Sequence, residues 1–144
     1  MSMEKYNKIH FIGIGGISMS SLAEILKSNG KTITGSDGVA SNVTKALENI
    51  GIQVSIGQKA ENITPDTDLI VYTAAVREDN PELMAARASG IETVDRAALV
   101  GMMMLEYKFP LSVAGTHGKT TTSSLVTEIF LEAKANPTVS IGGI

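Results

Sequence analysis

The sequence alternates short apolar runs with amphipathic stretches, and glycine residues separate most of them. This feature constrains the fold most strongly, because strand–helix alternation favours a parallel sheet with right-handed crossovers and helices on both faces. The predicted strands are 9–14, 31–35, 52–56, 68–73 and 91–94. The predicted helices are 18–28, 41–49, a segment that opens at Asn80-Pro81-Glu82 and ends at Gly90, and 96–106. We therefore predict an α/β fold built on a doubly wound, Rossmann-like parallel sheet.

The pattern changes at residues 107–110 (Tyr-Lys-Phe-Pro), which we interpret as a linker after a first domain over 1–106. Residues 111–144 then predict an incomplete strand–helix–strand unit, with strands at 111–114 and 137–141 around a helix at about 119–133. A lone unit of this kind cannot bury its own apolar face. We expect the exposed face of its helix to drive self-association through Leu125, Ile129 and Phe130.

Composition excludes several classes of function. The chain has 12 Lys and Arg against 15 Asp and Glu, a formal net charge of −3, which argues against partners such as nucleic acid or a membrane surface. The chain has no cysteine, which excludes disulfides, metal sites with thiolate ligands and cysteine nucleophiles. No apolar run approaches the roughly 20 residues that cross a bilayer, and the polar start lacks the apolar stretch of a signal peptide. We expect a cytoplasmic protein.

A glycine-rich loop, Gly13-Ile14-Gly15-Gly16-Ile17-Ser18, follows the first predicted strand and opens a helix. Glycine lets the backbone turn sharply and approach a pyrophosphate, while the helix presents free N–H groups to its oxygens. Asp37 lies 22 residues after Gly15, where an acidic side chain typically hydrogen-bonds ribose hydroxyls. Ser18 stands where the dinucleotide pattern has its third glycine. The loop therefore fits NAD(P) or a UDP-sugar, and a tight turn without a ligand is the alternative interpretation.

A second loop contains Gly118-Lys119-Thr120, between an apolar run and a predicted helix. In such loops backbone N–H groups surround the phosphates of a nucleoside triphosphate, while the lysine neutralises their charge and the threonine hydroxyl binds Mg²⁺. Val113 replaces the first glycine of the common pattern, so this is a variant loop. An accidental Gly-Lys-Thr is the alternative. We interpret His117 as a packing or phosphate-proximal residue rather than a catalytic base.

Several segments together resemble the Mur ligases. They are His10–Ile17 (His-Phe-Ile-Gly-Ile-Gly-Gly-Ile), Thr34–Asp37, Asn80–Glu82, Arg96-Ala97 and above all Ala114–Thr122 (Ala-Gly-Thr-His-Gly-Lys-Thr-Thr-Thr). The resemblance covers about 8–143, and His117 favours the family member that adds L-alanine over those that add later amino acids. The sequence departs from the family pattern at Ser18, at Gln58 and at Thr73-Ala74-Ala75.

The resemblance implies an ATP-dependent ligase of peptidoglycan precursor synthesis, in which 1–106 binds UDP-N-acetylmuramic acid and 111–144 begins the central ATP-binding domain. The implied UDP-sugar contacts are Gly13, Ile14, Gly15, Gly16, Ile17, Ser18, Ser36, Asp37, Thr73, Ala74 and Ala75, with Val76 in the same cleft. The implied ATP contacts are Gly115, Thr116, His117, Gly118, Lys119, Thr120 and Thr121. Lys119 and Thr120 are the implied catalytic residues, and the Thr120 hydroxyl would hold Mg²⁺.

In the chemistry that the resemblance implies, ATP converts the muramic acid carboxylate into an acyl phosphate, which the amine of L-alanine attacks. Because only a short segment follows Thr122, we expect the chain to be the N-terminal part of a longer ligase and to be inactive alone. Two other functions stay open. An NAD(P)-binding oxidoreductase domain would leave the second loop unexplained, and the third possibility is a nucleotide-binding module without catalysis.

Overall fold

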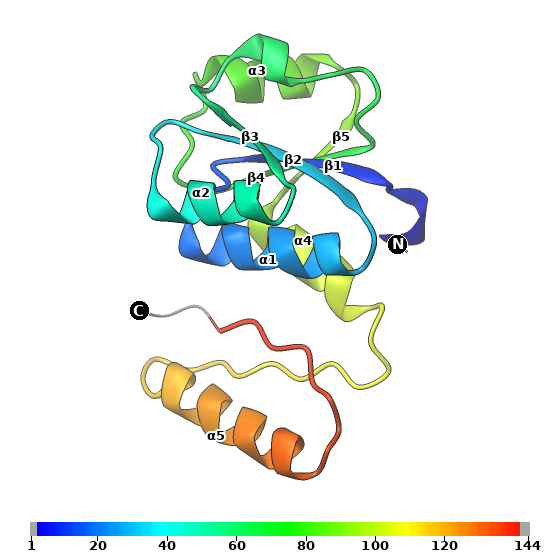
Figure 1. Ribbon diagram of the computed structural model, residues 1–144, viewed down its shortest axis with the longest axis vertical. Helices are drawn as coiled ribbons and strands as arrows, with labels where there is room; N and C mark the ends of the chain where they lie inside the picture. Colours follow the sequence, from blue (N-terminus) through cyan, green and yellow to red (C-terminus); the bar gives the residue numbers. More distant parts are fainter. Residues whose placement is uncertain (1–2, 142–144) are drawn as a thin grey trace. The chain divides into compact units, whose positions relative to one another are not determined.

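The computed structural model describes residues 3–141 (Figure 1). The chain divides into two compact units, Met1–Lys108 and Phe109–Ile144. In the first unit, residues 3–108 contain one parallel sheet of five strands in the order β3-β2-β1-β4-β5. The strands are β1 (Lys8–Ile12), β2 (Thr32–Asp37), β3 (Gln53–Ile56), β4 (Leu69–Tyr72) and β5 (Glu92–Asp95). The predicted doubly wound α/β fold of the first unit is confirmed.

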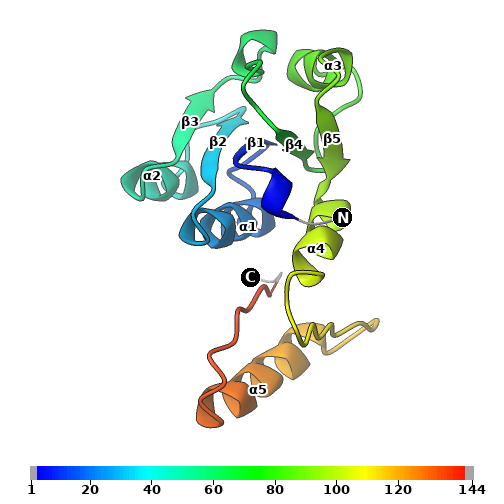
Figure 2. The ribbon, with the colours of Figure 1, turned by 90° about the vertical axis from the view of Figure 1, so that its right-hand side faces the viewer.

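Helices cover both faces of this sheet, as Figures 1 and 2 show. α1 (Ile17–Ser28), α2 (Asn42–Asn49) and α4 (Arg96–Met104) lie on one face, and α3 (Pro81–Ala88) lies on the other. Two short 3₁₀ helices, η1 (Met3–Lys5) and η2 (Ala60–Asn62), complete the unit. The larger apolar core lies beneath α1, α2 and α4, and a smaller one lies beneath α3.

The central strand β1 explains why the sheet forms as it does. Ile9, Phe11 and Ile12 are completely buried, which is typical of a parallel strand covered on both faces. Phe11 pairs with Gly35 of β2 in the strand register. A Cβ added at Gly35 would lie 2.6 Å from Ile14 Cδ1, so glycine at this position makes room for the Ile14 side chain.

Two strand ends differ from the prediction near the first glycine loop. β1 stops at Ile12 instead of residue 14, because Gly13 has a φ of 83° and turns the chain out of the sheet. β2 continues to Asp37 instead of stopping at residue 35, since it pairs with β3 as far as Ile56. Both changes leave the loop and Asp37 at the same edge of the sheet.

The second unit contains α5 (Lys119–Glu132), which confirms the predicted helix. The two strands predicted beside it, 111–114 and 137–141, were wrong: neither is a strand in the described part of the chain. A strand needs a neighbour to accept its hydrogen bonds, and all sheet pairing in residues 3–141 involves β1–β5. Lys134 and Asn136 also adopt positive φ angles of 54° and 49°, which interrupt an extended path just before residue 137.

No helix within residues 3–141 is both long enough and apolar enough to span a bilayer.

Candidate functional site

The first glycine-rich loop connects β1 to α1 and is fixed by the backbone of β2. The N–H groups of Gly13 and Ile14 both donate to the Ser36 carbonyl, each over 2.9 Å. A Cβ on Gly13 would lie 2.6 Å from Thr73 Cγ2, in addition to the strain of its positive φ. Glycine at position 13 therefore permits both the turn and the close approach of the segment after β4.

The loop leads directly into α1, and the first turn of this helix has no side-chain cap in the described part of the chain. Gly16 is the N-cap residue, and as a glycine it has no side chain to accept a hydrogen bond from the first turn. The first N–H groups of a helix and its dipole make such an end favourable for an anion. α2 and α3, by contrast, are capped by Ser41 and Asn80.

Asp37, at the end of β2, contacts the glycine loop directly. Its Oδ2 accepts a hydrogen bond of 2.9 Å from the Gly15 N–H, and its Oδ1 accepts one of 3.2 Å from Val39. A Cβ on Gly15 would lie 2.8 Å from that Oδ2. The glycine-rich loop and the Asp37 carboxylate, which the sequence analysis predicted to bind the same ligand, therefore lie next to each other.

A cleft of about 590 Å³ opens beside the loop. It lies at the carboxyl ends of β1, β2 and β4, where the chain reverses its winding direction; open α/β sheets bind ligands at this position. Its lining residues are Gly13, Gly16, Asp37, Gly38, Gln58, Thr73, Ala75, Val76, Arg77, Asp79, Asn80 and Pro81. Four separate segments of the first unit therefore contribute to one cleft.

Some sequence-predicted residues lie away from the cleft lining. Ile14 and Ser36 are completely buried, Ile14 in the larger core and Ser36 with its hydroxyl donating to Glu82 Oε2 over 2.6 Å. The Ser18 hydroxyl accepts a hydrogen bond of 3.1 Å from Arg96. The other predicted residues outside the lining are Gly15, Ile17 and Ala74, of which Ile17 and Ala74 are exposed.

The cleft also contains polar residues that the sequence analysis did not assign to the site. Arg77 is the only cation among the described lining residues, and its guanidinium forms two hydrogen bonds of 3.0 and 2.9 Å with Asp79. Gln58 Oε1 accepts a hydrogen bond of 2.6 Å from Asn80 Nδ2. Residues just after parallel strands lie together at one edge of the sheet. Gln58 follows β3, and Arg77 and Asn80 follow β4, so their positions in the sequence already indicated that they lie at this edge.

The second predicted loop lies in the second unit, at the start of α5. Gly118 is the N-cap residue with a φ of 72°, and within residues 3–141 no side chain caps this helix. Lys119 Nζ lies 2.5 Å from the Gly115 carbonyl oxygen and 3.5 Å from that of Thr116. The loop therefore curves around the lysine ammonium. Thr116, His117, Thr120 and Thr121 are exposed.

No group of three or more potential metal-ligating side chains (His, Cys, Asp or Glu) occurs in the described residues.

The chain is similar in sequence to a known protein family. The model of the "Mur ligase family, catalytic domain" matches residues 8–108. The UDP-N-acetylmuramate–L-alanine ligase of Agathobacter rectalis is 58% identical over 136 residues, which cover 94% of this chain and 30% of the relative. The chain thus spans about a third or less of the length of the curated relatives that it matches.

Solved structures agree with these matches. The UDP-N-acetylmuramate-alanine ligase of Thermotoga maritima has a TM-score of 0.85 and 39% identity, over 95% of this chain and 32% of that structure. A murein peptide ligase from Psychrobacter arcticus has a TM-score of 0.79 and 30% identity, over 88% of this chain and 27% of that structure.

Proposed function

The chain belongs to the Mur ligase family, and on this premise we propose that its first unit binds UDP-N-acetylmuramic acid in the cleft beside the Gly13–Ser18 loop. The observation that carries the proposal is the uncapped start of α1 at the switch point of the sheet, next to a cleft of about 590 Å³. A nucleotide sugar supplies both a diphosphate for the helix end and a ribose for an acidic side chain.

The residues around the cleft support this ligand class. Gly16, the exposed N-cap residue of α1, leaves the start of the helix open to phosphate oxygens, and Arg77 places a guanidinium on the same lining. Asp37 is the acidic group at the end of β2 that ribose hydroxyls would contact. Its present partner, the Gly15 N–H, would then become available to a phosphate oxygen.

We propose ATP as the ligand of the second loop. The uncapped start of α5, the left-handed Gly118 and the inward-curving Lys119 ammonium have the chemistry of a phosphate cradle. Gly115, Thr116, His117 and Thr121 would surround the phosphates, and the Thr120 hydroxyl would contribute to Mg²⁺ binding. ATP with Mg²⁺ would supply the phosphoryl group that activates a carboxylate.

We propose further that these two units serve a ligase that joins L-alanine to the muramic acid carboxylate in peptidoglycan precursor synthesis. The names of the relatives and of the Thermotoga maritima structure support this reaction. In it, Lys119 would stabilise charge on the transferring phosphoryl group, and the first unit would orient the sugar carboxylate.

Isothermal titration calorimetry tests the ligand of the first unit. We expect the 144-residue chain to bind UDP-N-acetylmuramic acid with a dissociation constant on the order of micromolar or somewhat weaker, and NADH to produce no heat. Heat with NADH and none with the UDP-sugar would overturn the proposal in favour of an NAD(P)-binding domain.

We also propose that the second unit promotes self-association. Its helix exposes Leu125, Ile129 and Phe130 by 61%, 66% and 40%, and exposed apolar side chains favour association. Light scattering should show a mass that rises with protein concentration, and Ile129→Glu should reduce this rise. A constant monomer mass at all concentrations would contradict the proposal.

A further inference from the structure

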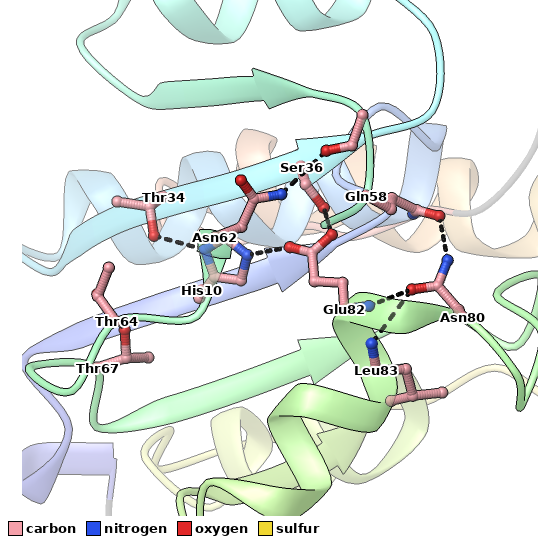
Figure 3. A network of polar contacts seen from close by, with 11 residues as sticks. His10, Thr34, Ser36, Gln58, Asn62, Thr64, Thr67, Asn80, Glu82 and Leu83 are labelled. Atoms are coloured by element: carbon pink, nitrogen blue, oxygen red, sulfur yellow. Dashed lines mark hydrogen bonds and ion pairs between the residues drawn. The ribbon is translucent and has the colours of Figure 1, made fainter. Parts of the chain in front are cut away.

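A buried polar network lies behind the cleft, between α3 and the central strands (Figure 3). Its centre is Glu82, in the first turn of α3, which is 0% exposed. Glu82 Oε1 lies 2.7 Å from His10 Nε2 of β1, and Oε2 accepts a hydrogen bond of 2.6 Å from the Ser36 hydroxyl of β2. At the far end, His10 Nδ1 lies 2.8 Å from Thr34 Oγ1, also on β2.

The surroundings of this network are apolar. Ile12, Ile70, Leu83 and Ala86 form the smaller core on this face of the sheet. Burying a carboxylate and an imidazole there costs free energy unless their polar atoms are hydrogen-bonded, and every buried side-chain nitrogen or oxygen of the described residues has a partner. Apolar side chains of similar volume often fill such a space equally stably, so a buried polar network here points to a role beyond stability.

Ser36 connects the network to the glycine loop. Its hydroxyl is held by Glu82, and its carbonyl accepts the N–H groups of Gly13 and Ile14. The next residue, Asp37, carries the carboxylate that lines the cleft. A displacement of Ser36 would therefore move the loop backbone and Asp37 together.

Asn80 connects the same network to the other wall of the cleft. Its Oδ1 accepts hydrogen bonds from the N–H groups of Glu82 and Leu83, over 3.0 and 3.2 Å. Its amide nitrogen donates to Gln58, and both Asn80 and Gln58 line the cleft. The Glu82 backbone is thus bonded to Asn80, which lines the cleft, while its side chain is bonded to Ser36, which lies behind the glycine loop on the opposite side of the cleft.

We infer that Glu82 is a positioning residue for the UDP-sugar site. Glu82 acts on the glycine loop through Ser36, whose hydroxyl it accepts and whose carbonyl accepts the N–H groups of Gly13 and Ile14. Thr34, at the far end of the network, has its side-chain hydrogen bond with His10 and not with the loop. This inference rests on the proposed binding of UDP-N-acetylmuramic acid.

Two matched substitutions separate positioning from a purely structural role. Ser36→Ala removes the hydrogen bond between Ser36 and Glu82, and Thr34→Val removes the one between Thr34 and His10. Each leaves one buried polar atom without a partner, so we expect similar decreases in the thermal midpoint. We expect Ser36→Ala to weaken UDP-N-acetylmuramic acid binding about tenfold, whereas Thr34→Val changes it by less than about twofold.

The control with the unmodified chain keeps the two hypotheses apart. If the unmodified chain binds the UDP-sugar and both variants bind equally well, the positioning role is refuted and the proposed function stands. If the unmodified chain does not bind, the proposed function itself is refuted. Amide chemical shifts of Gly13 and Ile14 should change in Ser36→Ala and stay unchanged in Thr34→Val.

Glu82→Gln provides a second test that does not depend on the folding of Ser36→Ala. The glutamine oxygen can accept the Ser36 hydroxyl, and its amide can donate to His10 Nε2 when the imidazole proton lies on Nδ1. We expect this variant to bind the UDP-sugar within about twofold of the unmodified chain. A tenfold loss would show that the charge of Glu82, rather than its contact with Ser36, controls the cleft, and would overturn the inference.

Discussion

Gly15 is the position where a single methyl group most directly tests the geometry of the first loop. A Cβ there would lie 2.8 Å from Asp37 Oδ2 and 3.2 Å from Thr44 Cγ2. Gly15→Ala should therefore displace the Asp37 carboxylate or the loop, weaken UDP-N-acetylmuramic acid binding about tenfold and lower the free energy of unfolding by about 1–3 kcal/mol. Calorimetry and urea unfolding measure the two effects.

Gly101→Ala is the matched control for that experiment. Gly101 is an exposed residue inside α4, and a Cβ there would meet no atom within 4 Å. Alanine should raise the free energy of unfolding by about 0.5–1 kcal/mol, because it restricts the unfolded chain and favours helix, and it should leave ligand affinity unchanged. Equal binding by both alanine variants would contradict the role given to the loop.

The residues of the cleft were predictable only in part. Gly13, Gly16 and Asp37 follow from local rules, since a glycine turn and an acidic residue mark the ends of adjacent strands. The burial of Ser36 and its contact with Glu82 depend on α3 packing across the sheet, which links positions 46 residues apart. No local sequence pattern records such a contact.

β1 and β4 are joined at their starts by Asp68, whose Oδ2 accepts the N–H groups of Asn7 and Lys8, each over 2.8 Å. These two hydrogen bonds lower the pKa of Asp68 below its usual value. A lowered pKa in the folded state gives a contribution to stability that is present above the unfolded pKa of about 3.9 and is lost as the pH falls through the folded pKa.

Asp68→Asn should therefore destabilise the protein at pH 7 and have a smaller effect as the pH falls below about 4. Urea unfolding of both proteins across this range measures the difference. The unmodified chain should itself lose stability in the same range, because the Lys8 ammonium lowers the pKa of Asp66 to about 2. A difference between the two proteins that is independent of pH would contradict this account.

The strands and helices of the first unit were predictable because most apolar runs end near a glycine or a helix-capping residue. Ser41 and Asn80, for example, accept hydrogen bonds from the first turns of α2 and α3. The strands predicted at 111–114 and 137–141 failed for a different reason. An apolar run specifies a strand only where another strand can pair with it, and residues 3–141 offer these segments no such neighbour.

The two loops belong to two separate units of the chain, and Lys119→Ala tests whether they serve separate ligands. The substitution removes the ammonium that the second loop surrounds. We expect ATP binding to weaken at least about tenfold and UDP-N-acetylmuramic acid binding to change by less than about twofold. Lys45→Ala, the same charge change on the exposed side of α2, should alter neither affinity.

A large loss of UDP-sugar affinity in Lys119→Ala would mean that the two loops bind one ligand together. It would also remove the basis for assigning ATP to the second unit alone.

An amide NMR titration with UDP-N-acetylmuramic acid shows residue by residue whether the glycine loop after β1 holds the diphosphate of a UDP-sugar. We predict that the largest chemical-shift changes fall on the amides of Gly15, Gly16 and Ile17 and on Asp37, while the amides of residues 115–121 stay unchanged. Changes confined to residues 115–121, or none near the start of α1, would contradict the account.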